Sequence, residues 1–514
     1  MMKRRQFLRG CSALALAACN PAMIKPTPIV KTHSGSVQGD VVQGVHRFLG
    51  IPYAAPPFGQ YRFRSPAEPT KWQGVFPATQ YGLICPQTGG IQLGLPDEGE
   101  DCLNLNVWTP DPGNGSLPVM VWAHGGGQLS GSGANELYDG THFAREGVVL
   151  VTCNRRLGAE GFLYLEELVG DGIGPGNLGI QDLGFVLQWV QKNISNFGGD
   201  PNNVTLFGES GGGAAVHALL ATPGSEGLFH RIISQSGGHA AQRPDTATAI
   251  AERMLNHFGM GARDLEKLQS LPWQMLVEAY DLIDEQVLGR PQIYLPVINQ
   301  HMPIHPVDAS FEGMGHSVDY LIGHCRDEAR LFSALLPSLE DSVFYRRANQ
   351  IVVGSGQAWS TVQSAYQASF PNLDEDQIST RIMGDLWFRI PSLRIAAGHA
   401  KFAKAKTFVY QFDWESPMIG AAHSLDLMVF GNGLPFAPLA GFADYSETSG
   451  RMRRAWVNFA ADGTPSTPDL EWSDYSEEES VVHIDETFST TTGPPSELEP
   501  LERVLSESWL ELDL

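Results

Sequence analysis

The chain has 514 residues, of which 42% are hydrophobic and 18% are charged, so it can bury a large core and is not an intrinsically disordered protein. Its 34 basic and 57 acidic residues give a formal net charge of −23. This balance argues against a nucleic-acid-binding protein, because phosphate contacts need clustered Lys and Arg. The acidity favours solubility and does not identify a partner.

Residues 1–18 are predicted to be an export signal. A basic start that includes Arg4 and Arg5 is followed by an apolar run at residues 11–18, which is too short to span a bilayer. The segment RRQFL resembles a twin-arginine signal, the type that exports folded proteins. We therefore expect a bacterial protein that is exported from the cytoplasm.

The end of this signal offers two processing routes. The segment LAAC resembles a lipobox, in which Cys19 would become the lipidated first residue of the mature chain. The alternative is ordinary cleavage after Ala17, which would leave a soluble periplasmic protein. The expected location is thus the periplasm, or the outer membrane with an anchor at Cys19. Residues 19–30, which are rich in proline, are predicted to form a tether.

The rest of the chain, residues 31–514, is predicted to form one α/β domain. Short β-prone runs with Gly and Pro turns come first, and from about residue 118 apolar strands alternate with helices. This alternation predicts a large, mostly parallel central sheet with helices on both faces. Residues 241–315 and 330–400 are more helical and polar, and they are expected to be insertions above the sheet. The predicted strands cover residues 118–123, 148–153, 204–207, 231–234, 320–322 and 407–412, and the predicted helices cover 183–194 and 211–222.

The cysteines indicate one disulfide and no metal site. In an oxidising compartment Cys85 and Cys102 are the natural pair. Cys153 follows an apolar run and is expected to be a buried thiol, whereas Cys325 has no obvious partner. The spacing of the cysteines does not match a zinc site, and the sequence contains no HExxH segment.

No cofactor is implied either. Residues 174–179 match GxGxxG, but no strand precedes them directly. The acid about 20 residues further on lies in a Gly-Gly-Asp-Pro turn instead of ending a strand, as a dinucleotide site requires. The segment is interpreted as a loop that leads into a helix.

A GxSxG segment at residues 208–212, within FGESGG at 207–212, predicts a nucleophilic serine. It lies between an apolar strand and a small-residue helix, the context in which a sharp turn exposes a serine hydroxyl at the edge of a sheet. The glycines on either side of Ser210 leave room for the crowded backbone of this turn. The alternative, an incidental serine in a glycine-rich turn, does not explain the flanking strand and helix.

A nucleophilic serine needs a site that stabilises the negative charge of its intermediate. The segment HGGG at residues 124–127 follows an upstream strand, as the anion-hole loop of lipases and esterases does. We expect the backbone amides of Gly126, Gly127 and Gly211 to donate hydrogen bonds to the oxyanion. A flexible glycine turn is the alternative for HGGG alone.

Taken together, these segments resemble the type-B carboxylesterases, the cholinesterase-like family of α/β-hydrolases. The resemblance covers nearly the whole mature chain and implies the α/β-hydrolase fold, with helical insertions over the active site. In the family's second signature, EDCLNLNV, the cysteine at position 102 supports its pairing with Cys85. The matching segments are FLGIPYA at 48–54, RF at 62–63, EDCLNLNV at 100–107, NLGIQD at 177–182, FGGDP at 197–201 and FGESGG at 207–212.

The resemblance implies a triad of Ser210, Glu328 and His423, in the chain order Ser, Glu, His. Glu328 lies in a segment that matches the family's GxxxDEG except that Ala329 replaces glycine, and Asp327 is the second candidate for the acid. His423 precedes an acid and a Val-Phe-Gly, as the family's histidine does. His423 would take the proton of Ser210 while Glu328 fixes its tautomer.

Other positions have two interpretations or depart from the family. Glu209 matches the family and either supports the imidazolium electrostatically or is a structural buried acid, whereas Ser236 is interpreted as structural. Gly211 replaces the usual alanine after the nucleophile, and Gln128 stands where an aromatic residue is common. Residues 86–101 contain no aromatic side chain that could hold a quaternary ammonium, which predicts poor turnover of choline esters.

The expected function is hydrolysis of small to medium neutral alkyl or aryl esters through an acyl-enzyme, with a small-molecule ester as the partner and no nucleic acid. An esterase specialised for a bulky natural ester is the first alternative. A non-catalytic binding protein on the same fold is the second, because a fold does not imply a function. The sequence indicates neither the oligomeric state nor the acyl and alcohol groups.

Overall fold

A computed structural model describes residues 25–88, 94–170, 172–237, 241–286, 293–335, 343–354, 356–402 and 404–493. The predicted export signal and Cys19 lie outside these residues, so both remain predictions. Within the described part of the chain, no helix has the length and the apolar character that crossing a membrane requires.

A twelve-stranded sheet organises the molecule, in the order β1-β4-β5-β7-β9-β8-β10-β11-β12-β13-β14-β15. Neighbouring strands from β9 to β14 are parallel, and the pairs at both ends of the sheet are antiparallel. A small separate sheet has the order β2-β3-β6. The strands are β1 (Lys25–Pro26), β2 (Val30–Lys31), β3 (Ser36–Gln38), β4 (Asp40–Val42), β5 (Val45–Pro52), β6 (Val75–Pro77), β7 (Asn104–Thr109), β8 (Leu117–Ala123), β9 (Val149–Cys153), β10 (Gly199–Glu209), β11 (Arg231–Gln235), β12 (Asp319–Cys325), β13 (Thr407–Phe412), β14 (Val481–Ile484) and β15 (Ser489–Thr491).

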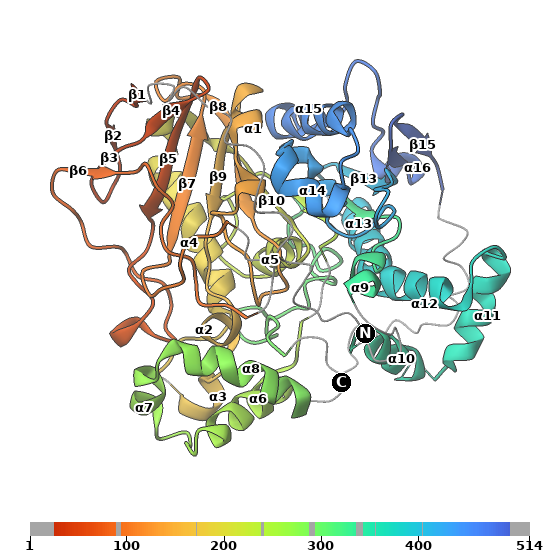
Figure 1. The fold of residues 1–514 in the computed structure, drawn as a ribbon, viewed down its shortest axis with the longest axis horizontal. Coiled ribbons are helices and arrows are strands. Elements are labelled where there is room, and N and C mark those ends of the chain that lie inside the picture. The colour runs from red at the N-terminus through yellow and green to blue at the C-terminus, as the bar shows by residue number, and fades with distance from the viewer. Residues whose placement is uncertain are drawn as a thin grey trace, which may run out of the picture.

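Helices cover the sheet and extend beyond it at both ends (Figure 1). Their positions confirm the predicted alternation of strands and helices, and with it the mostly parallel α/β fold. The helices are α1 (Thr141–Arg145), α2 (Gly158–Phe162), α3 (Glu166–Val169), α4 (Leu178–Asn193), α5 (Gly211–Leu220), α6 (Pro244–His257), α7 (Leu265–Ser270), α8 (Trp273–Gln286), α9 (Arg330–Leu335), α10 (Val343–Gly354), α11 (Trp359–Ser369), α12 (Glu375–Gly384), α13 (Ile390–Phe402), α14 (Gly433–Ala440), α15 (Ser446–Asp462) and α16 (Tyr475–Glu478).

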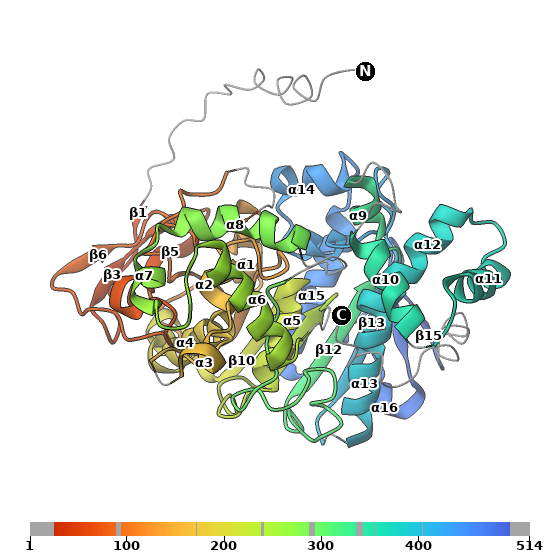
Figure 2. The same ribbon diagram turned by 90° about the horizontal axis from the view of Figure 1, so that it is seen from below.

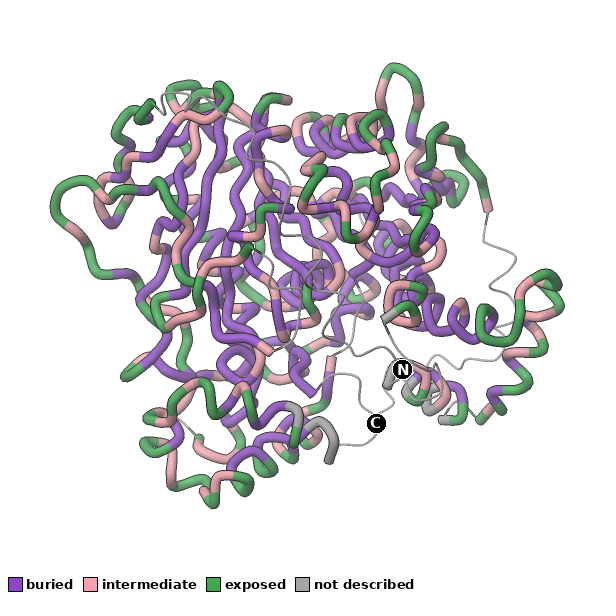
Figure 3. The backbone as a smooth tube through the Cα atoms, viewed as in Figure 1, coloured by how far each residue is buried: buried purple, intermediate pink, exposed green. Residues whose placement is uncertain are grey.

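Each face of the sheet buries its own hydrophobic core, because successive side chains of a strand point to opposite faces. In β8, Val121 packs into the core beneath α4, α5 and α13, whereas Trp122 packs into the core beneath α1 and α15. Leu206 and Phe207 of β10 divide between the two cores in the same way. Figure 3 shows the buried central strands. Each large side chain buried in this way contributes about 1.5–3 kcal/mol to folding.

The two predicted insertions are helical and lie at opposite ends of the molecule. The first contains α6, α7 and α8, and in both views α7 and α8 lie opposite α11 and α12 of the second (Figure 1, Figure 2). Helices α10, α11 and α12 contribute to a small hydrophobic core of their own. However, α13, which begins inside the second predicted insertion, packs on β12 and β13 and belongs to the layer that covers the sheet.

The folded domain begins earlier than the predicted boundary at residue 31. Residues 25 and 26 form β1, which pairs with β4, and β2 begins at Val30. Thr27 is buried, and its hydroxyl accepts a hydrogen bond from the backbone of Gly39 at 2.9 Å. A proline-rich composition indicated a tether, but edge strands also tolerate proline, and the composition cannot distinguish the two.

The predicted disulfide is not present in the structure. Cys85 and Cys102 are free, buried thiols whose Sγ atoms lie 2.8 Å apart, so the two side chains face each other without a covalent bond. Their pairing under oxidising conditions remains a prediction. Cys153 is buried, as expected, and Cys325 is buried as well.

Candidate active site

Ser210 lies on a strained turn between β10 and α5. Its backbone has φ 54° and ψ −124°, a conformation that costs a non-glycine residue free energy and is typical of functional turns. The Ser210 amide donates a hydrogen bond to the carbonyl of Gln235, at 2.8 Å, which ties the turn to the end of β11. A Cβ at Gly212 would collide with the carbonyl of Ala123, so glycine is required where the turn crosses β8. Ser210 is half-buried, at the carboxyl edge of the sheet.

Three unpaired backbone amides lie beside this serine. The amide groups of Gly126, Gly127 and Gly211 donate no hydrogen bond to any described residue. A Cβ at Gly125 would lie 3.3 Å from the Cβ of Ser210, and one at Gly211 would lie 2.6 Å from the Gly127 nitrogen, so the loop and the serine turn are in close contact. Gly126 is exposed and Gly127 half-buried, which leaves this set of donors accessible to a ligand.

Glu328 and His423 form a buried hydrogen-bonded pair at the same edge of the sheet. His423 Nδ1 lies 2.5 Å from Glu328 Oε2 and donates to it, because a carboxylate only accepts. The other oxygen, Oε1, accepts from Ser236 Oγ at 2.6 Å and from the Cys325 amide at 2.7 Å. Three donors therefore fix this carboxylate, and the carboxylate fixes the tautomer of His423.

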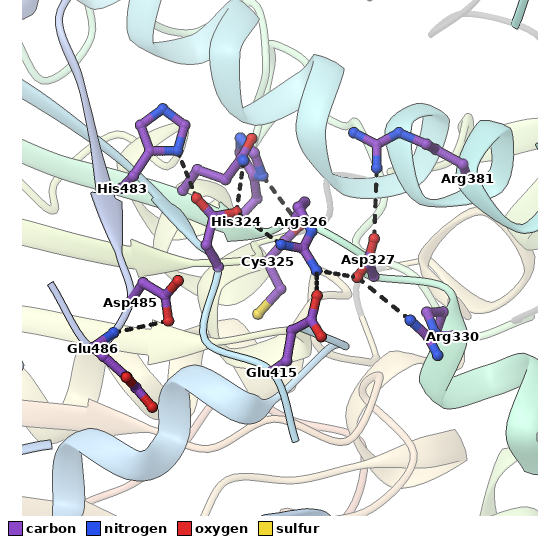
Figure 4. A network of polar contacts seen from close by, with 12 residues as sticks. His324, Cys325, Arg326, Asp327, Arg330, Arg381, Glu415, His483, Asp485 and Glu486 are labelled. Atoms are coloured by element: carbon purple, nitrogen blue, oxygen red, sulfur yellow. Dashed lines mark hydrogen bonds and ion pairs between the residues drawn. The ribbon is translucent and has the colours of Figure 1, made fainter. Parts of the chain in front are cut away.

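Asp327, the second candidate for the acid, faces a group of arginines (Figure 4). Its carboxylate accepts a hydrogen bond from Arg326 at 2.9 Å and pairs with Arg381 at 3.5 Å and Arg330 at 3.7 Å. Adjacent residues thus have separate surroundings, since Glu328 contacts the histidine and Asp327 contacts the cations. Ala329 has no left-handed backbone, so this turn does not require the glycine of the family pattern.

Glu209 lies on the other side of the His423 ring. Its Oε1 is 3.2 Å from His423 Nε2 and accepts a hydrogen bond from Ser424 Oγ at 2.6 Å. Burial raises the pKa of Glu209. Burial alone would lower the pKa of His423, but the negative charges of Glu209 and Glu328 outweigh it, so the pKa of the imidazole is raised. The two carboxylates therefore stabilise the imidazolium against the effect of burial.

Ser210 and His423 are not hydrogen-bonded to each other. His423 Nε2 has no hydrogen-bond partner among the described residues, and its nearest charged neighbour is Glu209. The His423 ring packs instead against Phe388 and Phe332, with centroid distances of 4.5 and 5.3 Å. Catalytic hydrogen bonds are often long or misaligned before substrate binds, and an unpaired Nε2 is able to accept a proton.

Sequence reasoning missed two positions that support these groups. Ser236, interpreted as structural, donates to Glu328, and Ser424, which was not singled out, donates to Glu209. One signal was available for Ser236. It follows β11, the parallel neighbour of β10, and the carboxyl ends of parallel strands lie at the same edge of the sheet.

Comparison with known proteins assigns the family. The sequence profile of the carboxylesterase family matches residues 26–498, so the chain belongs to the carboxylesterase family. The chain is 37% identical over 490 residues to para-nitrobenzyl esterase of Bacillus subtilis (strain 168), which covers 91% of this chain and 97% of that protein. It is 35% identical to fumonisin B1 esterase of Sphingopyxis macrogoltabida, over 89% of this chain and 86% of that one.

Solved structures agree with this assignment. A PNB esterase superposes with a TM-score of 0.82 at 33% identity and covers 93% of this chain and 99% of its own. A carboxylesterase of Geobacillus stearothermophilus at pH 6.2 has a TM-score of 0.83 at 33% identity and covers 93% and 100%. The α/β-hydrolase fold and the class of serine carboxylesterases, both expected from the motifs, are thereby confirmed.

Proposed function

We propose that the chain hydrolyses carboxylic esters with a triad of Ser210, Glu328 and His423. The supporting observation is that the hydrogen-bonded pair of Glu328 and His423 lies at the sheet edge where Ser210 occupies a strained turn beside three unpaired amides. A binding protein on this fold would not need a strained serine or an oriented histidine. The second candidate function therefore has no observation in its favour.

The chemistry follows from the roles of these groups. Ser210 Oγ attacks the ester carbonyl and gives its proton to His423 Nε2, while the amides of Gly126, Gly127 and Gly211 bind the oxyanion. The imidazolium then protonates the leaving alcohol, which leaves an acyl group on Ser210. Water attacks this acyl-enzyme by the same steps, and the free acid is released.

Glu209 has an electrostatic role in this proposal. The proton that reaches His423 would lie between the carboxylates of Glu328 and Glu209, at 2.5 and 3.2 Å from the two ring nitrogens. Both carboxylates lower the free energy of the imidazolium relative to the neutral ring. Glu209 stabilises this intermediate without itself exchanging a proton with substrate.

The proposed substrates are small to medium neutral alkyl or aryl esters. The name para-nitrobenzyl esterase describes an aryl-containing ester, whereas fumonisin B1 esterase and the phenmedipham hydrolase of Pseudarthrobacter oxydans (32% identical) are each named for one specific compound. A bulky natural ester is therefore the alternative. A panel of p-nitrophenyl esters from acetate to decanoate, with aryl esters beside them, separates the two by their kcat/KM values.

The first test compares Ser210→Ala with the unmodified chain on p-nitrophenyl acetate. Loss of the nucleophile should reduce kcat by about 10⁴-fold or more, and the variant should keep its circular dichroism spectrum and melting temperature. Ser364→Ala is the matched control, because it removes an exposed serine hydroxyl that donates only within α11, to the carbonyl of Ser360 at 2.7 Å. Full turnover by a folded Ser210→Ala variant would exclude the mechanism.

A second test concerns choline esters. Without an aromatic side chain in residues 86–101, a quaternary ammonium has no ring to bind there. A neutral thioester should therefore have a higher kcat/KM than butyrylthiocholine, its counterpart of equal acyl length. The reverse order would contradict this part of the proposal.

Export and anchoring belong to the proposal as well. We propose that the signal at residues 1–18 exports the enzyme, that Cys19 carries lipid, and that Cys85 and Cys102 form a disulfide after export. Cys19→Ser should move the enzyme from the membrane fraction to the soluble periplasm. Non-reducing mass mapping of the exported protein should find a peptide that links Cys85 to Cys102, and two free thiols there would exclude the disulfide.

A further inference from the structure

Arg155 is a buried cation behind the anion-hole loop. It follows β9 at the carboxyl edge of the sheet and has no solvent exposure. Its guanidinium donates one hydrogen bond to the side-chain oxygen of Gln128 and another to the carbonyl of His124, at 3.2 Å. These two contacts lie at opposite ends of the segment that contains Gly126 and Gly127.

This cation has no ion pair among the described residues. The neighbouring Arg156 donates hydrogen bonds to both oxygens of the buried Asp182, at 2.8 and 2.6 Å. Among the described residues, no carboxylate forms an ion pair with Arg155. Burial lowers the pKa of Arg155 to about 10, so it is still charged at neutral pH. An unpaired buried charge is costly, and one that persists in a fold invites a functional explanation.

Gln128 connects this cation to the nucleophile's helix. It is buried, with a left-handed backbone at φ 64°, and its side-chain nitrogen donates to the carbonyl of Gly211 at 2.7 Å. Because the donor on Arg155 requires an oxygen opposite it, the orientation of the Gln128 amide is fixed. The backbone carbonyl of Gln128 is also held, by the amide of Gly158 at 2.8 Å.

Gly211 completes the arrangement. The space that its side chain would occupy is taken by Gly127, whose nitrogen lies 2.6 Å from the position of a Cβ. The loop therefore packs directly on the first turn of α5. No side chain interlocks at this junction, so hydrogen bonds help the backbone contact to define the relative position of the two sets of amide donors.

We propose that Arg155 and Gln128 are positioning residues of the anion hole, in which Arg155 holds both ends of the loop and Gln128 fastens the loop to the Gly211 carbonyl. This role rests on the proposed ester hydrolysis. Neither side chain touches substrate. Together they keep the amides of Gly126 and Gly127 aimed at the same point as the amide of Gly211. The side chain of Gln128 separates the positive charge of Arg155 from the anion hole. At this distance the charge also favours the oxyanion over the neutral ester. His124 adds no charge, because burial lowers its pKa to about 3.

The test uses Arg155→Met, Gln128→Met and the double variant, assayed on p-nitrophenyl butyrate. Each single change should lower kcat by about 10–100-fold and leave KM within about threefold, because the hole acts on the transition state. The kcat of the double variant should lie within about threefold of the kcat of the less active single variant, because both changes break the same chain of hydrogen bonds. Affinity for a trifluoromethyl ketone, whose adduct with the serine places an oxyanion in the hole, should fall in parallel with kcat.

Arg231→Met is the matched control. Arg231 begins β11 at the opposite edge of the sheet, where its partners include the carbonyl of Ala460 at 3.0 Å and Asp319 at 3.5 Å. Its loss should leave kcat unchanged. If Arg155→Met does not fold, Gln128→Met and Arg155→Lys allow the same kcat and KM comparison.

A measurement that does not depend on turnover completes the design. Hydrogen exchange of the peptide covering residues 124–131 should be faster in Arg155→Met than in the unmodified chain and in Arg231→Met. Wild-type kcat and unchanged exchange in both loop variants would overturn the inference and leave the proposed hydrolysis intact. Absence of ester turnover in the unmodified chain would instead refute the proposed function, and the exchange data would still decide whether Arg155 orders the loop.

Discussion

The two sides of Ser210 handle charge in opposite ways. Around His423 the fold gathers carboxylates, with Glu328 at 2.5 Å and Glu209 at 3.2 Å from the two ring nitrogens. Around Gly126 and Gly127 it offers neutral amides with a buried guanidinium behind them. Because the proposed reaction moves a proton toward the histidine and negative charge toward the glycines, each side would stabilise the charge that develops there. Because different residues supply the two sides, a substitution can impair one side and leave the other intact.

On the two sides of Ser210, the largest effect is expected from Glu328→Gln, which keeps the shape of the side chain but loses the charge that orients His423. Replacement of an orienting acid by its amide costs about 10⁴-fold in a comparable triad. We expect a loss of about 10³–10⁴-fold in kcat with a folded protein. Asp327→Asn is the adjacent control, and because its carboxylate contacts arginines it should change kcat by less than about threefold. Equal losses in the two variants would contradict this assignment of the acid.

Gly211→Ala should damage the amide side while the carboxylates remain intact. The new Cβ would lie 2.6 Å from the Gly127 nitrogen and 2.9 Å from its Cα, so the loop must move away. We expect kcat to fall by about 10²-fold, comparable to the loss of one oxyanion donor, although alanine favours the helix by up to about 1 kcal/mol. Gly184→Ala in α4, whose Cβ would meet only Leu219 at 3.4 Å, should leave kcat unchanged. An active Gly211→Ala enzyme would show that the contact is not required.

Glu209→Gln should shift the pH dependence. Loss of a negative charge next to Nε2 lowers the raised pKa of His423, so the acid limb of kcat/KM moves to lower pH, by about one unit. At the pH optimum kcat should fall by about 10-fold, because the imidazolium is less stabilised. A pH–rate profile from pH 5 to 9 measures both effects. An acid limb that stays in place or moves upward would assign Glu209 to a structural role.

The smallest effect is expected from the arginines behind the acid loop. Arg326→Gln removes the partner shared by Asp327 and Glu415 (Figure 4). Because Arg326 is partly exposed, solvent weakens these pairs, and we expect a fall of about 1–2 °C in Tm with kcat within about threefold. Differential scanning calorimetry measures this fall in Tm. Lys267→Gln, which breaks an exposed pair with Asp264, is the control. A large loss of kcat would extend the active site to these arginines.

Local patterns were sufficient for the main strands and for the serine turn. The mostly apolar runs at residues 118–123 and 204–207 lie in β8 and β10, because a strand segment that is buried on both faces is rich in apolar residues. The motif around Ser210 also predicted its turn, because glycines at those positions are required by close backbone contacts. For residues 19–30 the prediction of a tether rested on composition alone. It placed the start of the domain at residue 31, although β1 at residues 25–26 already pairs with β4.

Residues close together in the chain were enough to predict the fold class, the family and the candidate nucleophile Ser210. The choice between the two adjacent acids needed the tertiary structure, since Glu328 and His423 are 95 residues apart. The tertiary structure also decided the surroundings of the anion hole, where Gln128 reaches Gly211 across 83 residues and Arg155 reaches Gln128 across 27. Such contacts depend on the order and register of the strands that bring distant segments to one edge of the sheet, and no local pattern records that order.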